Sequence, residues 1–272
     1  MVGFPKAKIN IGLRITEKRS DGYHNIETIF YPVSLCDALE IVEAGGEATE
    51  DRITVTGLDT KIPGGDNLVI KAVKVLRQKF HIPCLNIHLH KVIPPGGGLG
   101  GGSSDAACTL ITLNRQFRLH LHLPELKSIA LGLGSDCPFF MNPVPSIATG
   151  RGETLMPVKP LSGHYYLVLL NPGTDISTAE AYRNCRPAVP SSSLMDLYLK
   201  PVSEWEGLIV NDFEDYVFAG YPAIGELKRI LRDSGALFSS MSGSGSTVYG
   251  IFDRIPELPG EVKKYIIYNG LL

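Results

Sequence analysis

Six glycines occupy seven consecutive positions between Gly96 and Gly102, with two prolines before them and two serines after them. Glycine lacks a Cβ atom, so the backbone N–H groups of such a segment can turn toward one centre and surround an anion. A helix is predicted to begin near Ser104, and its first N–H groups and positive dipole end would strengthen that attraction. The residue types and their spacing therefore indicate a cradle for phosphate.

Two common phosphate-binding motifs do not fit this glycine cluster. Gly96, Gly98 and Gly101 match the spacing of a dinucleotide-binding loop, but residues 119–123 lack the acidic residue expected about 20 positions later. A P-loop would need a lysine directly after its last glycine, and the sequence has none there. A flexible loop in which Ser104 only caps the helix is the structural alternative. A phosphate cradle of another type is the interpretation that remains.

Lys8 and Asp136 are the charged residues that could act on a bound phosphate or on its acceptor. Ile9 and Ile11 are expected to face the core from a strand, which places Lys8 and Asn10 on the opposite face. A single lysine on a strand is more often a solvated surface charge. Asp136 lies in a tight turn before an apolar stretch, where an aspartate commonly forms an Asx turn or a helix cap. The spacing alone leaves these alternatives open.

The first third of the chain has the residue pattern of strands. Residues 8–16 and 25–35 are rich in Ile, Leu, Thr and Phe, and residues 19–22 between them are typical of a turn, which predicts one long hairpin. Further strands are predicted at residues 38–42 and 52–56.

From Asp66 onward the apolar residues change to helical spacing, which predicts an amphipathic helix capped by Asp66 and closed by Pro83. Residues 85–89 alternate between apolar and polar types, so a half-buried strand is expected to lead into the glycine cluster.

The other predicted helices are residues 105–117, 124–131, 177–184 and 222–233, and the other predicted strands are residues 165–170, 237–241 and 247–252. Strands and helices mix without strict alternation, so the sequence favours an α+β fold over a doubly wound parallel sheet. A domain boundary is expected near residues 150–163, where Gly and Pro are frequent and periodicity is absent.

Composition excludes several classes of protein. The 272 residues carry a formal net charge of −2, with 44% hydrophobic and 20% charged residues, so nucleic acid is not an expected partner. The longest apolar run, residues 165–170, is far shorter than the roughly 20 residues of a membrane span. Five cysteines without a Cys-x-x-Cys pair indicate reduced thiols, and no secretory signal is readable. We therefore expect a soluble cytoplasmic protein that binds no membrane.

Five segments together resemble the GHMP kinases, the family of galactokinase, homoserine kinase, mevalonate kinase and phosphomevalonate kinase. Their sequences are AKINIGL (residues 7–13), RSDGYH (19–24), PPGGGLGGGSSDAA (94–107), GSDCPF (134–139) and MSGSGS (241–246). The resemblance covers roughly residues 5 to 250, and the combination of segments is specific.

The resemblance implies a two-domain α+β fold with the active site in the cleft between the domains. It implies an N-terminal ATP-binding domain at residues 1–155 and a C-terminal family domain at residues 156–272. The implied reaction is ATP-dependent phosphorylation of the 2-hydroxyl of a methylerythritol compound that carries a cytidine diphosphate group, in isoprenoid synthesis without mevalonate. Another member of the family, acting on mevalonate, homoserine or a similar acceptor, is the alternative.

The resemblance also implies roles for individual residues. Lys8 and Asp136 would be catalytic, with Lys8 stabilising charge and Asp136 taking the hydroxyl proton. ATP would be bound by Pro94, Pro95, Gly96, Gly97, Gly98, Leu99, Gly100, Gly101, Gly102, Ser103 and Ser104. The acceptor would be bound by Asn10, Tyr23, His24, Thr178, Tyr182 and Gly243.

Several further expectations accompany these roles. Mg²⁺ is expected with ATP, although no protein ligand for it is assigned. Asp105 is the competing carboxylate, expected to act as a charge at the helix N-terminus or in indirect contact with magnesium. Gly243 and Gly245 would let the chain turn close to substrate phosphates, an ordinary bend being the alternative. The His-Leu-His runs at residues 88–90 and 120–122 are not expected to bind metal. The protein is expected to be a monomer or a weak homodimer.

Overall fold

The computed structural model describes residues 1–46, 48–58 and 67–272. The chain divides into two compact units that interleave along the sequence. Unit 1 contains Met1–Ala7, Leu35–Pro95 and Gly100–Pro143, and unit 2 contains Lys8–Ser34, Gly96–Leu99 and Val144–Leu272. These units are defined by packing and are not the domains expected from the sequence. The expected domain boundary between residues 155 and 156 therefore stays a prediction.

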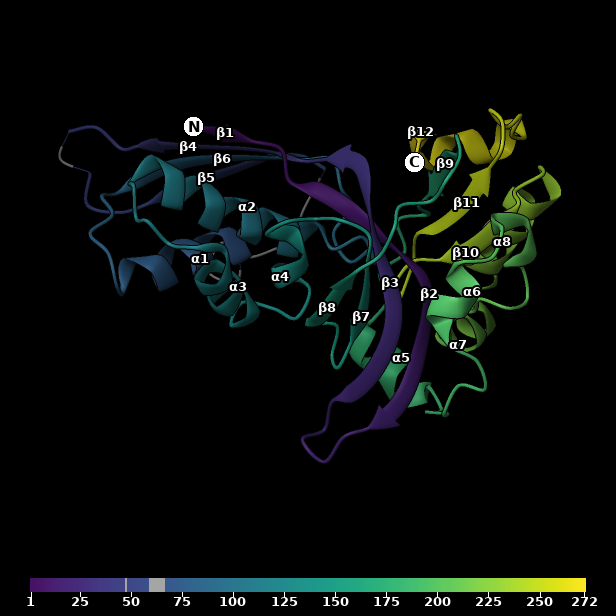
Figure 1. The fold of residues 1–272 in the computed structure, drawn as a ribbon. Helices are drawn as coiled ribbons and strands as arrows, with labels where there is room; N and C mark the ends of the chain where they lie inside the picture. The colour runs from purple at the N-terminus through teal and green to yellow at the C-terminus, as the bar shows by residue number, and fades with distance from the viewer. Residues whose placement is uncertain (47, 59–66) are drawn as a thin grey trace. The chain divides into compact units, whose positions relative to one another are not determined.

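Among its described residues, unit 1 contains a four-stranded sheet and four α-helices. The strand order is β1 (Val2–Gly3), β4 (Ala38–Glu43), β6 (Leu85–Lys91) and β5 (Arg52–Gly57). Strand β6 pairs antiparallel with β4 and parallel with β5. The helices are α1 (Leu68–Arg77), α2 (Gly101–Gln116), α3 (Leu123–Leu131) and α4 (Cys137–Phe140). Helices α1, α2 and α3 lie on one side of this sheet (Figure 1).

The predicted periodicities explain how this sheet and its helices pack. In β6, buried residues alternate strictly with exposed ones, as the sequence predicts. The buried residues of α1 are Val69, Ile70, Ala72, Val73 and Leu76. Asn67 caps α1, because its side chain accepts a hydrogen bond from the Val69 N–H at 2.9 Å. Asp66, the residue expected to form this cap, lies outside the described residues.

Unit 2 contains two four-stranded sheets. The first has the order β2 (Lys6–Lys18), β3 (His24–Cys36), β7 (Ser146–Thr149) and β8 (Thr154–Pro157), and its first two strands form the long predicted hairpin. The second has the order β10 (Phe238–Met241), β11 (Val248–Phe252), β9 (Tyr166–Leu170) and β12 (Ile266–Leu271), all antiparallel. The helices of unit 2 are α5 (Thr178–Asn184), α6 (Leu194–Tyr198), α7 (Glu214–Gly220) and α8 (Pro222–Asp233), with 3-10 turns at Val202–Glu204 and Gly260–Tyr265.

The largely antiparallel sheets confirm the predicted α+β class. A core cluster joins apolar residues of β2, β9 and β11 to α7 and α8, including Leu13, Val168, Val217, Leu231 and Val248. Strand β12, which was not predicted from the sequence, extends this sheet beyond β9.

The start of α2 differs from the prediction. The helix begins at Gly101, three residues before Ser104, and its first internal hydrogen bond runs from the Ser104 N–H to the Gly100 carbonyl at 2.9 Å. Gly100 has a left-handed backbone with φ of 71°, a conformation that glycine adopts without steric cost. The last two glycines of the cluster therefore belong to the helix and not to the loop.

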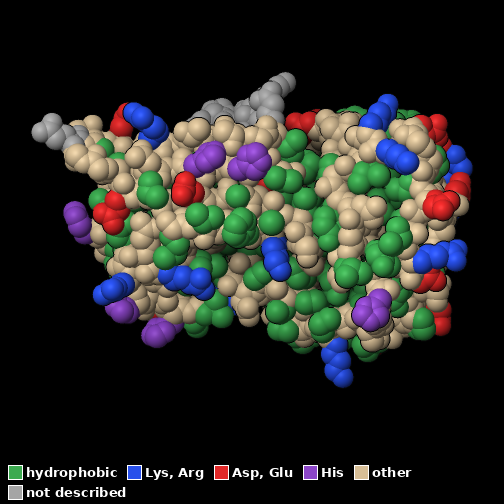
Figure 2. All heavy atoms as spheres, turned by 90° about the horizontal axis from the view of Figure 1, so that it is seen from above, with side chains coloured by type: hydrophobic (Ala, Val, Ile, Leu, Met, Phe, Trp, Pro, Cys, Tyr) green, Lys and Arg blue, Asp and Glu red, His purple; other side chains and the backbone are tan. Residues whose placement is uncertain are grey.

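All five cysteines are free thiols. Across the described parts of the chain, no helix has the length and apolar character needed to cross a membrane. Basic and acidic side chains are interspersed on the face shown in Figure 2.

Candidate active site

The backbone of the glycine loop alternates in handedness. Gly96, Gly98 and Gly100 have φ values of 69°, 76° and 71°, whereas Gly97 and Leu99 between them do not have positive φ. An alternation of right-handed and left-handed residues turns successive N–H groups toward one side, which creates a concave site for an anion. Leu99 is buried and fixes the middle of the loop.

The N-terminus of α2, in unit 1, is by itself suited to an anion. Its cap residue, Gly100, has no side chain to accept from the first N–H groups of the helix. These groups have no partners within the helix, so they and the positive dipole end are suited to an anion. Ser103 is half-buried, and Ser104 is buried in the same first turn. Pro94 and Pro95 precede the loop in the sequence.

Gly98 is in close contact with the late glycine turn at residues 242–246. A Cβ atom added at Gly98 would lie 1.9 Å from the Ser242 carbonyl oxygen, and one added at Gly243 would lie 3.1 Å from the Gly98 Cα atom. Gly243 and Gly245 have φ values of 56° and 88°. The two glycine segments therefore approach each other backbone to backbone, which only glycine permits at these positions.

Lys8 and Asn10 are buried next to this contact. Their exposed fractions are 3% and 2%, because β2 is covered on both faces, so the alternative of a solvated strand lysine is wrong. The Lys8 ammonium donates hydrogen bonds to the Asn10 side-chain oxygen and, at 3.1 Å, to the Gly98 carbonyl. The Lys8 N–H also donates to the Leu99 carbonyl at 3.0 Å. The predicted lysine and the predicted phosphate loop are therefore held together within unit 2.

Ser242 links these groups, and the sequence analysis assigned it no role. Its hydroxyl donates to the Gly98 carbonyl at 2.9 Å and accepts from the Asn10 N–H at 3.2 Å. Ser246, four residues further along, is equally buried, but its hydroxyl donates to the Thr174 carbonyl at 2.6 Å. The two serines therefore provide a matched comparison.

We expect Ser242→Ala to lower kcat about tenfold, because a buried N–H of Asn10 loses its acceptor and the carbonyl shared with Lys8 loses a donor. Ser246→Ala removes one buried hydroxyl of the same kind without touching Lys8, Asn10 or Gly98. It should lower the thermal midpoint by a similar amount and change kcat less than twofold. Steady-state kinetics and thermal unfolding of both variants make the comparison. Equal losses of kcat would contradict a specific role for Ser242.

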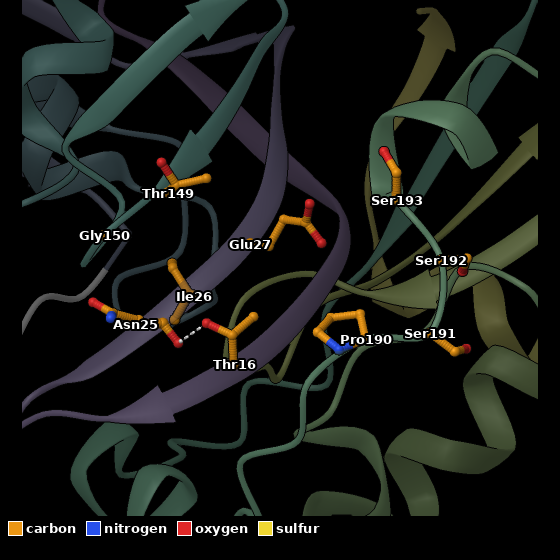
Figure 3. A pocket seen from close by; sticks show the side chains of 10 residues that line it. All are labelled: Thr16, Asn25, Ile26, Glu27, Thr149, Gly150, Pro190, Ser191, Ser192 and Ser193. Atoms are coloured by element: carbon orange, nitrogen blue, oxygen red, sulfur yellow. Dashed lines mark hydrogen bonds between the residues drawn. The ribbon is translucent and has the colours of Figure 1, made fainter.

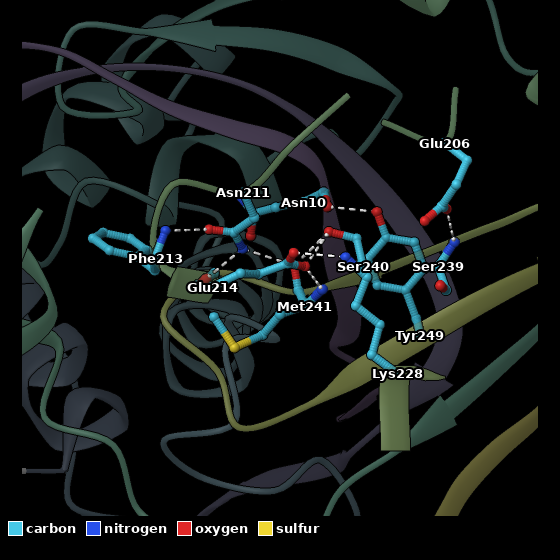
Figure 4. Close-up of polar contacts among 11 residues, drawn as sticks. Asn10, Glu206, Asn211, Phe213, Glu214, Lys228, Ser239, Ser240, Met241 and Tyr249 are labelled. Atoms are coloured by element: carbon cyan, nitrogen blue, oxygen red, sulfur yellow. Dashed lines mark hydrogen bonds and ion pairs between the residues drawn. The ribbon is translucent and has the colours of Figure 1, made fainter. Parts of the chain in front are cut away.

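Further hydrogen bonds hold the backbone of Asn10 and of the late glycine turn in place (Figure 4). The Tyr249 hydroxyl donates to the Asn10 carbonyl at 2.8 Å. The Asn211 side-chain amide donates to the carbonyls of Met241 and Gly243 at 2.8 and 2.9 Å. All of these groups are buried, so each hydrogen bond fixes the position of a backbone carbonyl.

The aromatic residues predicted for the acceptor site are partly brought together. The rings of His24 and Tyr182 stack with centroids 5.1 Å apart and an interplanar angle of 17°, and Tyr182 also contacts Phe213 edge to face. Tyr23 is exposed, and the Arg151 guanidinium lies 4.9 Å from its ring centroid. Burial, with a smaller contribution from Lys18, lowers the pKa of His24, so its imidazole is neutral at pH 7.

Helix α5 connects this aromatic pair to the late glycine turn. Thr178, its first residue, shares a hydrogen bond of 2.8 Å with the Ser244 hydroxyl, and Tyr182 lies one turn further along. Ser177 caps the helix by accepting from the Glu180 N–H. The predicted residues Thr178, Tyr182 and Gly243 thus belong to one region of unit 2.

A pocket of 510 Å³ opens beside the hairpin strands at residues that follow His24 (Figure 3). Its lining residues are Thr16, Asn25, Ile26, Glu27, Thr149, Gly150, Pro190, Ser191, Ser192 and Ser193. Arg14, which is buried, holds one wall by donating to the Ser192 carbonyl at 2.7 Å and to Glu27 at 3.3 Å. The volume lies within the range of small-molecule sites.

Asp136 lies in unit 1, at the N-cap position of the short helix α4. Its side chain makes no capping hydrogen bond, so the alternative of a helix cap is not what the structure has. Helix α4 packs against α2, and a Cβ added at Gly134 would lie 3.8 Å from the Ser103 hydroxyl oxygen. Burial raises the pKa of the neighbouring Cys137 thiol to about 11, so this thiol is protonated near neutral pH.

Asp105 does not have its expected role as a charge at the helix N-terminus. It lies in the second turn of α2, is 3% exposed, and pairs with the Lys91 ammonium at 2.7 Å. The helix begins earlier than predicted, so Asp105 points into the interior of unit 1 and not toward the helix end. Lys91 and its second partner, Asp37, were not identified from the sequence.

The described part of the chain contains no cluster of side chains that could hold a metal ion by itself. Within residues 1–46, 48–58 and 67–272, no group of three or more His, Cys, Asp or Glu side chains could hold an ion. His88 and His90 both contact the Thr56 hydroxyl on the exposed side of β6, at 2.8 and 3.0 Å. A magnesium ion here would need most of its ligands from phosphates and water, which is how Mg²⁺ usually binds with nucleotides.

Two segments of the chain match models of one protein family. Residues 67–144 match the model of the GHMP kinases N terminal domain, and residues 199–264 match that of the GHMP kinases C terminal domain. The chain belongs to the GHMP kinase family.

Two named relatives and one solved structure are similar to nearly the whole chain. A protein of Parabacteroides distasonis named 4-diphosphocytidyl-2-C-methyl-D-erythritol kinase is 48% identical over 254 residues, or 93% of this chain and 92% of the relative. A protein of the same name from Bacteroides thetaiotaomicron is 46% identical over 259 residues, or 95% and 94% of the two chains. A crystal structure of 4-(cytidine 5'-diphospho)-2C-methyl-D-erythritol kinase superposes with a TM-score of 0.79 at 29% identity, covering 100% of this chain and 98% of the other.

Proposed function

We propose that this protein is an ATP-dependent kinase that phosphorylates the 2-hydroxyl of 4-diphosphocytidyl-2-C-methyl-D-erythritol, in isoprenoid synthesis by the non-mevalonate pathway. The observation that carries the proposal is the contact of the Lys8 ammonium with the carbonyl of Gly98, because it joins a cationic side chain directly to a loop shaped for phosphate. Two relatives named for this activity are 46–48% identical to the chain, and the match covers nearly their whole length. They support the choice of acceptor.

In the proposed reaction, Asp136 accepts the proton of the acceptor hydroxyl while the hydroxyl oxygen forms a bond to the γ-phosphorus of ATP. The bond between that phosphorus and the bridging oxygen breaks, and ADP leaves with the electron pair. Negative charge is spread over the transferring phosphoryl group in this step, and the Lys8 ammonium stabilises it. The glycine loop and the first turn of α2 hold the other phosphates through backbone N–H groups.

Mg²⁺ would neutralise phosphate charge when it is bound with ATP. We propose that it is held mainly by phosphate oxygens and water, because the described residues supply no cluster of three ligating side chains. Asp105 is a poor candidate for a direct ligand, since its carboxylate is buried against Lys91.

Tyr23, His24 and Tyr182 would provide the rings that receive the cytosine base, and stacking contributes about 1–3 kcal/mol per base. A neutral His24 can both donate and accept hydrogen bonds at the edge of an uncharged base. We propose that the adjacent 510 Å³ pocket admits part of the nucleotide. Asn10, Thr178 and Gly243 would contact the rest of the acceptor.

A panel of acceptors tests this function. Purified protein, ATP and Mg²⁺ would be combined with the cytidyl compound, mevalonate or homoserine, and ADP release would be followed in a coupled assay. We expect turnover only with the cytidyl compound. Turnover of mevalonate or homoserine instead would establish the alternative within the family. A cytoplasmic location and a monomeric or weakly dimeric state remain part of the proposal.

A further inference from the structure

Asp37, Lys91 and Asp105 form a buried group of charges in unit 1, which we call the Lys91 clasp. Asp37 directly precedes β4, Lys91 is the last residue of β6, and Asp105 lies in the second turn of α2. The exposed fractions of the three residues are 1%, 4% and 3%. The Lys91 ammonium pairs with Asp37 and, at 2.7 Å, with Asp105.

The clasp lies at both ends of the glycine loop. Lys91 is followed by Val92, Ile93 and then Pro94, where the loop begins, and Asp105 directly follows Ser104, where the predicted ATP contacts end. The ion pair between Lys91 and Asp105 therefore ties the entry of the loop to its exit, across 14 positions of sequence.

Asp37 fixes the entry of the loop in a second way. One oxygen of its carboxylate accepts hydrogen bonds from the N–H groups of Val92 and Ile93, at 2.5 and 2.8 Å. A Cβ atom added at Gly101, the first residue of α2, would lie 2.9 Å from the Ile93 side chain and 3.3 Å from the Lys91 ammonium nitrogen. The start of α2 thus rests directly on the residues that the clasp holds.

The clasp has an unbalanced charge, which distinguishes it from an ordinary stabilising ion pair. Two carboxylates share one ammonium, and the Asp105 Oδ1 atom is buried without a hydrogen-bond partner among the described residues. Burial raises the pKa of Asp105 to about 7; Lys91 opposes this increase and Asp37 adds to it. Cys108, one turn further along α2, adds no charge, because burial raises its pKa to about 11.

The raised pKa of Asp105 makes the stability of the folded protein depend on pH. A folded-state pKa above the ordinary value of 3.8 means that folding favours the protonated form, so the stability that Asp105 contributes is lost as pH rises through about 7. Above that pH Asp105 is ionised, and its attraction to Lys91 only partly offsets the cost of burying its charge. A charge that lowers stability and lies at the end of a ligand-binding loop is better explained by positioning than by stability.

We propose that Lys91, held by Asp37 and paired with Asp105, is a positioning residue that sets the span of the ATP-phosphate loop and the placement of the first turn of α2. This inference rests on the proposed function, because it takes the loop to bind ATP. It makes no use of the identity of the acceptor.

Direct ATP binding to the full-length protein tests the proposal, with Asp105→Asn compared against Asp51→Asn. Asparagine has nearly the shape of aspartate, so Asp105→Asn removes the charge of the pair and leaves Lys91 paired with Asp37. Asp51 is a control in the same unit, since among the described residues its hydrogen-bond partners are Arg77, at 2.6 and 2.8 Å, and the Leu85 N–H, at 2.9 Å, neither of which belongs to the glycine loop.

We expect Asp105→Asn to bind ATP about tenfold more weakly, with a KM for ATP raised to match and kcat at saturating ATP unchanged. Its thermal midpoint at pH 8 should equal or exceed that of the unmodified protein. Asp51→Asn should have a lower midpoint and an unchanged ATP affinity. This opposite pair of results is one that a merely structural role for Asp105 would not produce.

Unchanged ATP affinity in Asp105→Asn would overturn the proposal, as would a lower affinity accompanied by the same loss of midpoint as in Asp51→Asn. If the unmodified protein binds ATP but phosphorylates none of the acceptors, the proposed function fails, and the binding comparison still decides the role of the clasp. If it binds no ATP, both proposals are overturned.

Discussion

Asp136→Asn is expected to lower kcat by about 10²- to 10⁴-fold while the protein continues to bind ATP. The change replaces one carboxylate oxygen with an amide nitrogen and removes the only basic function of the side chain. The acceptor hydroxyl then has no group to take its proton as its oxygen attacks phosphorus. Asparagine has nearly the shape of aspartate, so we expect the packing of α4 against α2 to be retained.

Single-turnover kinetics and ATP binding together make this measurement decisive. The thermal midpoint should stay close to that of the unmodified protein, because asparagine has nearly the shape of aspartate. Cys137→Ser is a suitable neighbour control, since its thiol is protonated at neutral pH and has no proposed part in proton transfer. A kcat for Asp136→Asn within threefold of the unmodified protein would eliminate the general-base assignment without affecting the family.

Gly98→Ala is expected to abolish measurable ATP binding in whatever fraction of the protein folds. The new methyl group would lie 1.9 Å from the carbonyl oxygen of Ser242, an atom of the backbone that cannot rotate away. The loop and the late turn would have to separate, which would break the contacts of Gly98 with Lys8 and Ser242. We estimate a loss of about 3 kcal/mol in unfolding free energy from overpacking and left-handed strain together.

Gly207→Ala separates the two causes. Gly207 has the same φ of 76°, but a Cβ atom there would meet nothing within 4 Å. It should lose only the roughly 1–2 kcal/mol of left-handed strain and bind ATP normally. Denaturant unfolding and ATP titration of both variants provide the comparison. If the two variants behaved alike, the close backbone contact at Gly98 would have no special importance.

Much of the local structure could be predicted from the sequence, because it depends on neighbouring residues. The alternation at residues 85–89 and the helical spacing after residue 68 predicted β6 and α1 correctly. Position 91 continues the buried phase of that alternation, so a lysine there was a signal of a buried charge that the sequence analysis did not use. Asp37 gave no comparable signal, since its partners lie 54 to 56 residues away.

The start of α2 could not be predicted from propensity. Glycine is a poor helix former, so the cluster argues for a loop up to Ser104. In the structure, Gly101 is needed inside the helix, because any Cβ atom there would collide with Ile93. Packing thus overrides the local preference and moves the helix start, and with that shift Asp105 changes from a terminal charge to an interior one.

Residue types and short spacings in the sequence were enough to indicate six glycines able to cradle phosphate and segments similar to the GHMP kinases. The similarity to that family, and not the spacing, implied a lysine and an aspartate for phosphoryl transfer. The tertiary structure decided which groups meet. Ser242 joins Gly98, 144 residues away, to Asn10, 232 residues away, and the Lys91 clasp closes the loop at its two ends. Contacts across such separations depend on how strands and helices pack together, which no local pattern encodes.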